Sequence, residues 1–114
     1  MLCNAVRKLA EDFPDTVYSV VMGEKSCMYT IGTCGPGKGC IVGQAFVAAY
    51  PHLKHVAEYT DGTGIAGPET LLKNAGMEVH SADLEWLTVV QNKQDNGVEW
   101  SLAVKFADER LGLA

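Results

Sequence analysis

Residues 39–50, GCIVGQAFVAAY, form the most apolar stretch of the chain, carry no charged side chain and are followed by Pro51. In a helix, these apolar residues would point in almost every direction. That pattern is typical of a helix covered on several sides rather than of one lying on a surface. We therefore predict a central buried helix at residues 39–50, on which the rest of the chain packs.

Two elements are expected before this helix. Residues 2–12 place apolar side chains at the i, i+3, i+4, i+7 spacing of an amphipathic helix, with charged side chains between them. Residues 16–21 and 27–31 are rich in β-branched and aromatic side chains, and residues 22–26 have turn composition, so together they predict a β-hairpin. Because an isolated hairpin is marginally stable in water, it should pack on the central helix or pair with another strand.

The region after the central helix is less uniform. Residues 52–59 are ambiguous, and residues 60–64 have the composition of a loop. Residues 68–76 predict a short connector helix, because proline stands at its first position and glycine just past its end.

The C-terminal third predicts two helices, at about 82–95 and 98–111. Ser81 suits the N-cap of the first, and the Asn-Gly pair at 96–97 suits its end. The two helices would form an antiparallel hairpin or a helix-turn-helix corner. The predicted fold class is α+β and mainly α-helical: a small β-hairpin packed on a central buried helix, with a C-terminal helical hairpin, in a single domain at 1–114.

Composition and charge narrow the classes of function. The 114 residues suit one domain, and the net charge of −5 works against binding nucleic acid or an anionic membrane. No apolar run approaches the roughly 20 residues needed to cross a bilayer, and the first residues are amphipathic, unlike a secretion signal. We expect a cytoplasmic protein, and therefore free thiols at the four cysteines, Cys3, Cys27, Cys34 and Cys40.

Residues 86–104, WLTVVQNKQDNGVEWSLAV, carry the pattern W-L-x-x-V-Q-x-x-Q-D-x-G-x-x-W. This segment resembles a family of small uncharacterised proteins of actinobacteria and their phages. The likeness extends upstream through residues 27–29 and 39–45, although the glycine-rich loop at 32–39 is longer than that pattern has. The resemblance implies a small cytoplasmic domain of phage or actinobacterial origin, in the host cytoplasm if phage-encoded. It supplies no activity and no catalytic residues.

The glycine-rich loop at 32–39 contains G-x-x-x-x-G-K, the spacing of a phosphate-binding loop. Such a loop needs Ser or Thr after the lysine to ligate Mg²⁺, and Gly39 stands there. Glycines that let the chain turn into the central helix explain the same residues, so we favour a conformational role and predict no cofactor.

A metal site or a thiol enzyme is a further hypothesis. Three cysteines and two histidines are zinc-ligand types, but no C-x-x-C pair occurs, and Cys40 is expected to be an ordinary buried residue. We therefore predict no metal. Cys34 beside Lys38, with His52 or His55 as base, would suit a small thiol- or His-dependent enzyme, which stays an alternative function.

Residues 61–64, DGTG, superficially resemble a calcium loop or an aspartic-protease triplet. An EF-hand loop needs glutamate at its twelfth position, and Leu72 stands there when Asp61 is counted first. We predict an ordinary turn.

DNA binding by the C-terminal helices is a second alternative. Between Ser81 and Ala114 there are six acidic and three basic side chains, so a phosphate backbone would be repelled. The sequence therefore argues against nucleic acid.

Protein interaction is the function that we favour from the sequence. Trp86, Trp100 and Phe106 give the last two helices more aromatic mass than a helical hairpin of this size needs, although all three could instead be core residues. We predict a small interaction or regulatory protein, phage-associated, that binds itself as a homodimer or binds a host protein with a basic surface. The predicted interaction residues are Trp86, Gln91, Gln94, Asp95, Trp100 and Phe106.

Overall fold

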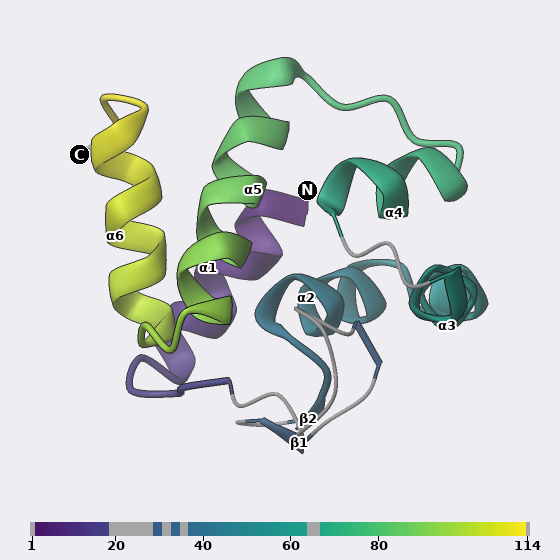
Figure 1. Ribbon diagram of the computed structural model, residues 1–114, viewed down its shortest axis with the longest axis horizontal. Helices are drawn as coiled ribbons and strands as arrows, with labels where there is room; N and C mark the ends of the chain where they lie inside the picture. The colour runs from purple at the N-terminus through teal and green to yellow at the C-terminus, as the bar shows by residue number, and fades with distance from the viewer. Residues whose placement is uncertain (1, 19–28, 31–32, 35–36, 64–66, 114) are drawn as a thin grey trace.

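The computed structural model describes residues 2–18, 29–30, 33–34, 37–63 and 67–113. The helices are named here in chain order and are shown in Figure 1: α1 (Leu2–Asp12), α2 (Ile41–Ala49), the 3₁₀ turn η1 (Pro51–Leu53), α3 (Lys54–Thr63), α4 (Pro68–Asn74), α5 (Ser81–Asp95) and α6 (Trp100–Arg110). Helices 2–12, 39–50, 68–76, 82–95 and 98–111 of the sequence analysis are each found, within a few residues at their ends.

The predicted α+β class with a β-hairpin is wrong, because the described part of the chain is built from helices. Its only extended pairing is a two-residue antiparallel contact between β1 (Thr33–Cys34) and β2 (Gly37–Lys38). Of the predicted hairpin, residues 16–18 and 29–30 are not strands, and the remaining residues lie outside the described ones.

Backbone groups in and next to the predicted hairpin form hydrogen bonds with the start of a helix and with a carboxylate instead of with a second strand. The carbonyl of Thr16 accepts from the amide of Trp100 at 2.9 Å, and that of Pro14 accepts from the amide of Ser101 at 3.1 Å. These bonds satisfy N–H groups at the start of α6 that have no partner within the helix. The amide of Tyr29 donates to the Asp61 carboxylate at 2.7 Å. At residues 16 and 29, hydrogen bonds to distant parts of the chain therefore decide the backbone structure, despite the strand propensity of these residues.

Helix α2 lies at the centre, between the α1–α5 side of the molecule and α3 (Figure 1). Its buried residues are Ile41, Val42, Gly43, Ala45 and Phe46. The prediction of a centrally packed helix is confirmed for this first part, whereas Ala48 in its last turn is exposed.

Helices α5 and α6 run antiparallel and side by side, so they form the hairpin rather than the corner (Figure 1). Gly97 makes the reversal at φ 83°, and the amide of Val98 donates back to the Lys93 carbonyl at 3.1 Å. The N-cap of α5 is His80, whose Nδ1 accepts from the amide of Ala82 at 3.4 Å, and not Ser81 as predicted.

The prediction of a loop at residues 60–64 is wrong for residues 60–63, which belong to α3. The helix continues to Thr63. Thr60 is fully buried, donates to the Val56 carbonyl at 2.8 Å and accepts from the Asn74 side chain at 3.0 Å. This contact with α4 outweighs the turn composition of the segment.

Tyr29 is held directly against α2. A Cβ atom added to Gly43 would lie 2.2 Å from the Tyr29 carbonyl oxygen, and one added to Gly39 would lie 1.9 Å from it. Gly39 also has φ +93°, which favours glycine. With glycine at positions 39 and 43, the backbone of residue 29 can approach α2 more closely than it could with any other residue type at these two positions.

We expect Gly43→Ala to lower the free energy of unfolding by about 1–3 kcal/mol or more, because the added methyl overlaps backbone atoms that cannot rotate away. Urea denaturation followed by circular dichroism measures the change. Gly62→Ala in α3 is the matched control. Its added methyl meets nothing within 4 Å, so it should leave stability unchanged or raise it by up to about 1 kcal/mol. Equal effects of the two substitutions would contradict the close packing of Tyr29 on α2.

Candidate functional site

Most of the predicted interaction residues are placed in the interior. Trp86 and Trp100 are 2% and 0% exposed, and Gln91 and Gln94 are 5% and 0% exposed. For the two tryptophans, the structure thus agrees with the alternative of core residues. Phe106 is 45% exposed, and Asp95 is partly buried.

The buried glutamines connect α5 to the centre of the fold. The Tyr29 hydroxyl donates to Oε1 of Gln91 at 3.3 Å, and burial raises the pKa of that hydroxyl, so it stays a donor. Oε1 of Gln94 accepts from the amide of Ile41 at 3.3 Å, which satisfies one of the unpaired N–H groups at the start of α2. Nε2 of Gln94 in turn donates to Asp95 at 2.6 Å. The side chains of Gln91 and Gln94 are therefore buried and hydrogen-bonded within the protein, so they are not available to contact DNA bases.

Asp61 forms a carboxylate clamp rather than a calcium loop or a catalytic pair. Its two oxygens accept from the amides of Tyr29 and Thr30 at 2.7 and 2.9 Å, and from the Thr30 hydroxyl at 2.5 Å. This carboxylate ties α3 to the chain that crosses α2. It satisfies backbone donors that have no helix or strand partner of their own.

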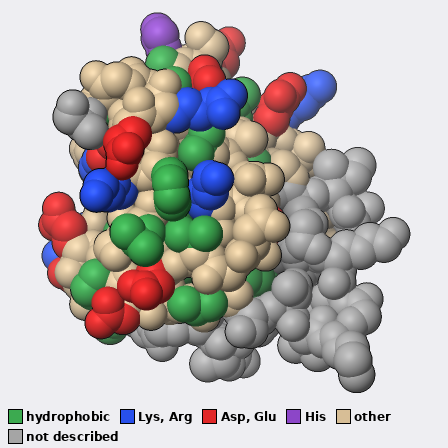
Figure 2. Space-filling view, turned by 60° about the vertical axis from the view of Figure 1, so that its left-hand side comes forward, with side chains coloured by type: hydrophobic (Ala, Val, Ile, Leu, Met, Phe, Trp, Pro, Cys, Tyr) green, Lys and Arg blue, Asp and Glu red, His purple; other side chains and the backbone are tan. Residues whose placement is uncertain are grey.

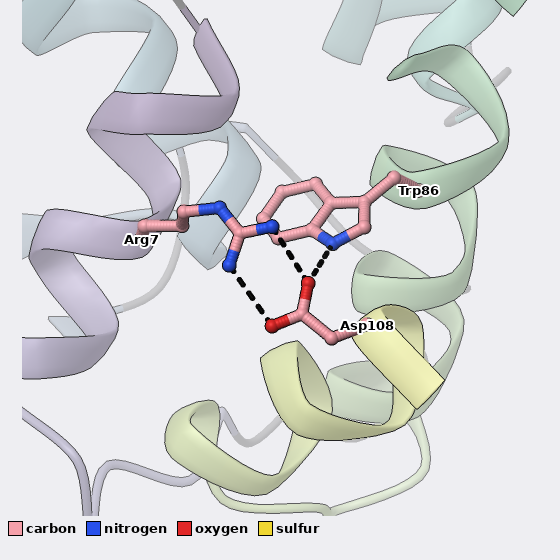
Figure 3. A network of polar contacts seen from close by, with 3 residues as sticks. All are labelled: Arg7, Trp86 and Asp108. Carbon is pink, nitrogen blue, oxygen red and sulfur yellow. Dashed lines mark hydrogen bonds and ion pairs between the residues drawn. The ribbon is translucent and has the colours of Figure 1, made fainter. Parts of the chain in front are cut away.

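Arg7, Trp86 and Asp108 join α1, α5 and α6 (Figure 3). Arg7 donates two hydrogen bonds to the Asp108 carboxylate, at 2.9 and 2.6 Å, and Trp86 Nε1 donates to the same carboxylate at 2.8 Å. The guanidinium carbon also lies 4.6 Å from the centroid of the Trp86 ring. This network could not be predicted from the sequence, because 101 positions separate the two charged residues and no local pattern connects them.

The hydrogen bonds from Arg7 lower the pKa of Asp108, and the bond from Trp86 adds to the effect. The network is therefore strongest when Asp108 is ionised. The Arg7 side chain is about one third exposed, so solvent weakens its ion pair with Asp108.

The cysteines correct the expectation that all four thiols are free. Cys40 is disulfide-bonded, and its partner is not among the side chains that the structure describes. Cys3 is free and half-buried; burial and then the negative charge of Asp83 raise the pKa of its thiol. The side chains of Cys27 and Cys34, and with them the proposed nucleophile, lie outside the described part of the chain.

The described residues include no group of three or more His, Cys, Asp or Glu side chains that could hold a metal ion. His52 and His55 are exposed near the start of α3. In the glycine-rich loop, Gly39 is turned against the Tyr29 carbonyl, whereas residues 32, 35 and 36 lie outside the described part.

A hollow of about 470 Å³ lies beside the exposed side of α2. Its lining includes Tyr29, Thr30, Gln44 and Lys54, with apolar side chains such as Val47 next to them. The Gln44 amide already donates to the Gly39 carbonyl at 2.9 Å. Among the described lining residues, Lys54 is the charged side chain, and Leu9, Val47 and Ala48 form an apolar wall.

A second surface lies on the outer side of α6. We call Leu102, Lys105, Phe106 and Glu109 the α6 outer face; they line a shallow hollow of about 160 Å³. Leu102 and Phe106 are 43% and 45% exposed, and Leu113, just past the helix end, is 61% exposed. Figure 2 shows hydrophobic side chains gathered on this side of the molecule, with charged side chains of both signs among them.

No family model, curated protein or solved structure matches this chain. The predicted relation to small actinobacterial and phage proteins stays a prediction. Among the described residues, no helix combines the length and apolar character needed to span a membrane.

We expect Asp108→Asn to lower the free energy of unfolding at neutral pH by about 1–2 kcal/mol, since it removes a charge that accepts three hydrogen bonds in a partly exposed site. The folded pKa of Asp108 lies below its ordinary value of 3.8. The stabilisation is therefore complete above that value and is lost as the pH falls through the lowered pKa. Chemical denaturation from pH 7 to pH 2 should show wild type and variant converging in acid.

Asp12→Asn provides the control for this prediction. It removes a solvent-exposed pair with Lys8 at 3.2 Å, so its effect should be at most about 0.5 kcal/mol. A constant difference between wild type and Asp108→Asn over the whole pH range would contradict the coupling of Asp108 ionisation to folding.

The disulfide is tested by alkylating unfolded protein without reductant and mapping the labelled peptides by mass spectrometry. Cys3 should be labelled at once, whereas Cys40 should be labelled only after reduction. Labelling of Cys40 without reductant would show that the bond does not form in the purified protein.

Proposed function

We propose that this protein acts by binding another protein chain, and that the α6 outer face is its docking surface. The observation that carries the proposal is the exposure of two large apolar side chains, Leu102 and Phe106, side by side on one helix. Contiguous exposed apolar side chains rimmed by charges are typical of protein interaction sites, and aromatic residues are enriched at their centres.

Comparison with Tyr59, another exposed aromatic residue, supports the choice of this face. Tyr59 is 65% exposed and belongs to α3, the helix on the opposite side of the molecule from α6 (Figure 1). Single exposed apolar side chains are normal in soluble proteins, whereas a pair around a shared hollow is less common. Lys93 Nζ lies 4.8 Å from the centroid of the Phe106 ring, so a cation covers only one side of that ring.

Charge is balanced on the α6 outer face, which has one lysine and one glutamate. Affinity there would come from burying apolar surface rather than from the net charge of −5. The predicted host partner with a basic surface, and the phage association, are not required by this proposal.

A photo-crosslinker placed in the site tests the proposal. Replacing Phe106 with p-benzoylphenylalanine keeps an aromatic side chain at the centre of the face. We expect irradiation to give adducts of higher mass, either in the purified protein or in a lysate of cells in which the protein naturally occurs.

The same substitution at Tyr59 is the matched control, because it also places the reagent at an exposed aromatic position. Comparable adducts from positions 59 and 106 would indicate nonspecific capture. The absence of any adduct from position 106 in both preparations would refute the docking role of this face.

A further inference from the structure

We propose that the occupant of the α6 outer face is a second copy of this chain, with the two α6 helices packed antiparallel about a two-fold axis near the level of residue 107. This inference rests on the proposed function and names its partner. It depends on the order of charged and apolar side chains along α6.

The outward positions of α6 fit an antiparallel pairing in one register. Along a helix each residue rises about 1.5 Å, so a two-fold axis at level 107 puts residue 105 of one copy opposite residue 109 of the other. Lys105 would then face Glu109 of the second copy, and the reverse contact would occur at the other end. The register is therefore charge-complementary at both ends.

Apolar residues match in this same register. Phe106 lies within one residue of the axis level and would contact Phe106 of the second copy, while Leu102 would lie close to Leu113. The amide of Leu113 donates to the Asp108 carbonyl at 2.7 Å, so this residue stays beside the helix end. At about 100° per residue, Lys105 and Phe106 lie toward opposite edges of the outer face, which keeps the ion pairs clear of the aromatic contact.

The two charges are available for such contacts. Within the described part of the chain, no ion pair uses Lys105 or Glu109, whereas the neighbouring Arg110 lies 3.6 Å from Glu85. In a parallel two-fold arrangement each residue would meet its own copy, so lysine would face lysine and glutamate would face glutamate. Like charges in contact disfavour that orientation.

Self-complementarity is what favours a second copy over an unrelated partner. An interface built on a two-fold axis requires one patch to fit itself, and the α6 outer face does so in charge and in apolar content. One helix pair is a small interface, which is typical of weak and reversible association. We expect dimerisation in the micromolar range or weaker.

Charge reversal tests the pairing directly by sedimentation equilibrium. Lys105→Glu and Glu109→Lys each turn two attractive contacts into repulsive ones, so each should weaken dimerisation on the order of 10-fold. The double variant Lys105→Glu/Glu109→Lys restores both pairs and should return the dissociation constant to within about threefold of wild type. Lys73→Glu on the exposed side of α4 makes the same charge change elsewhere and should have no effect.

The outcomes separate this inference from the proposed function. A monomeric wild type at millimolar concentration, with position 106 crosslinking to a different protein, would overturn the second copy and leave the docking surface standing. A dimer insensitive to both single reversals would overturn the antiparallel register. Thermal unfolding of every variant is measured to check that the fold is intact. An adduct of twice the chain mass that joins position 106 to α6 of the second copy would support the proposal.

Discussion

The position of Tyr29 is the constraint on which the other contacts depend. Its backbone lies on Gly39 and Gly43, its amide is held by Asp61 of α3, and its hydroxyl reaches Gln91 of α5. One fully buried residue thus connects α2, α3 and α5. A polar group buried at such a junction costs free energy unless each donor finds an acceptor, so the partners of Tyr29 are constrained as tightly as its own position.

This junction gives a physical reason for the pattern W-L-x-x-V-Q-x-x-Q-D-x-G-x-x-W. Its first tryptophan hydrogen-bonds Asp108, its two glutamines serve Tyr29 and the start of α2, and its glycine makes the turn between α5 and α6. The second tryptophan is fully buried at the start of α6. These roles are structural, so a protein could keep the whole pattern while its binding surface changed.

The sequence predicts the helices well because helical periodicity, proline starts and glycine ends are local signals. It fails where distant groups decide the outcome. Thr16 serves the start of α6, Asp61 binds residues 29 and 30, and Arg7 pairs with Asp108. For the candidate site, aromatic content pointed to the helix pair that carries the proposed surface, and of the predicted aromatic residues Phe106 is the one left on the surface. Leu102, Lys105 and Glu109 were not singled out, because their significance depends on which side of α6 faces the core.

The residues of α6 that face the core are distinct from those on its outer side. Trp100, Ala103 and Ala107 form the buried stripe, and Asp108 completes the network with α1 and α5. Leu102 and Phe106 are 43% and 45% exposed, so the folded single chain leaves part of their apolar surface in water. The proposed contact with another chain would bury this remaining apolar surface.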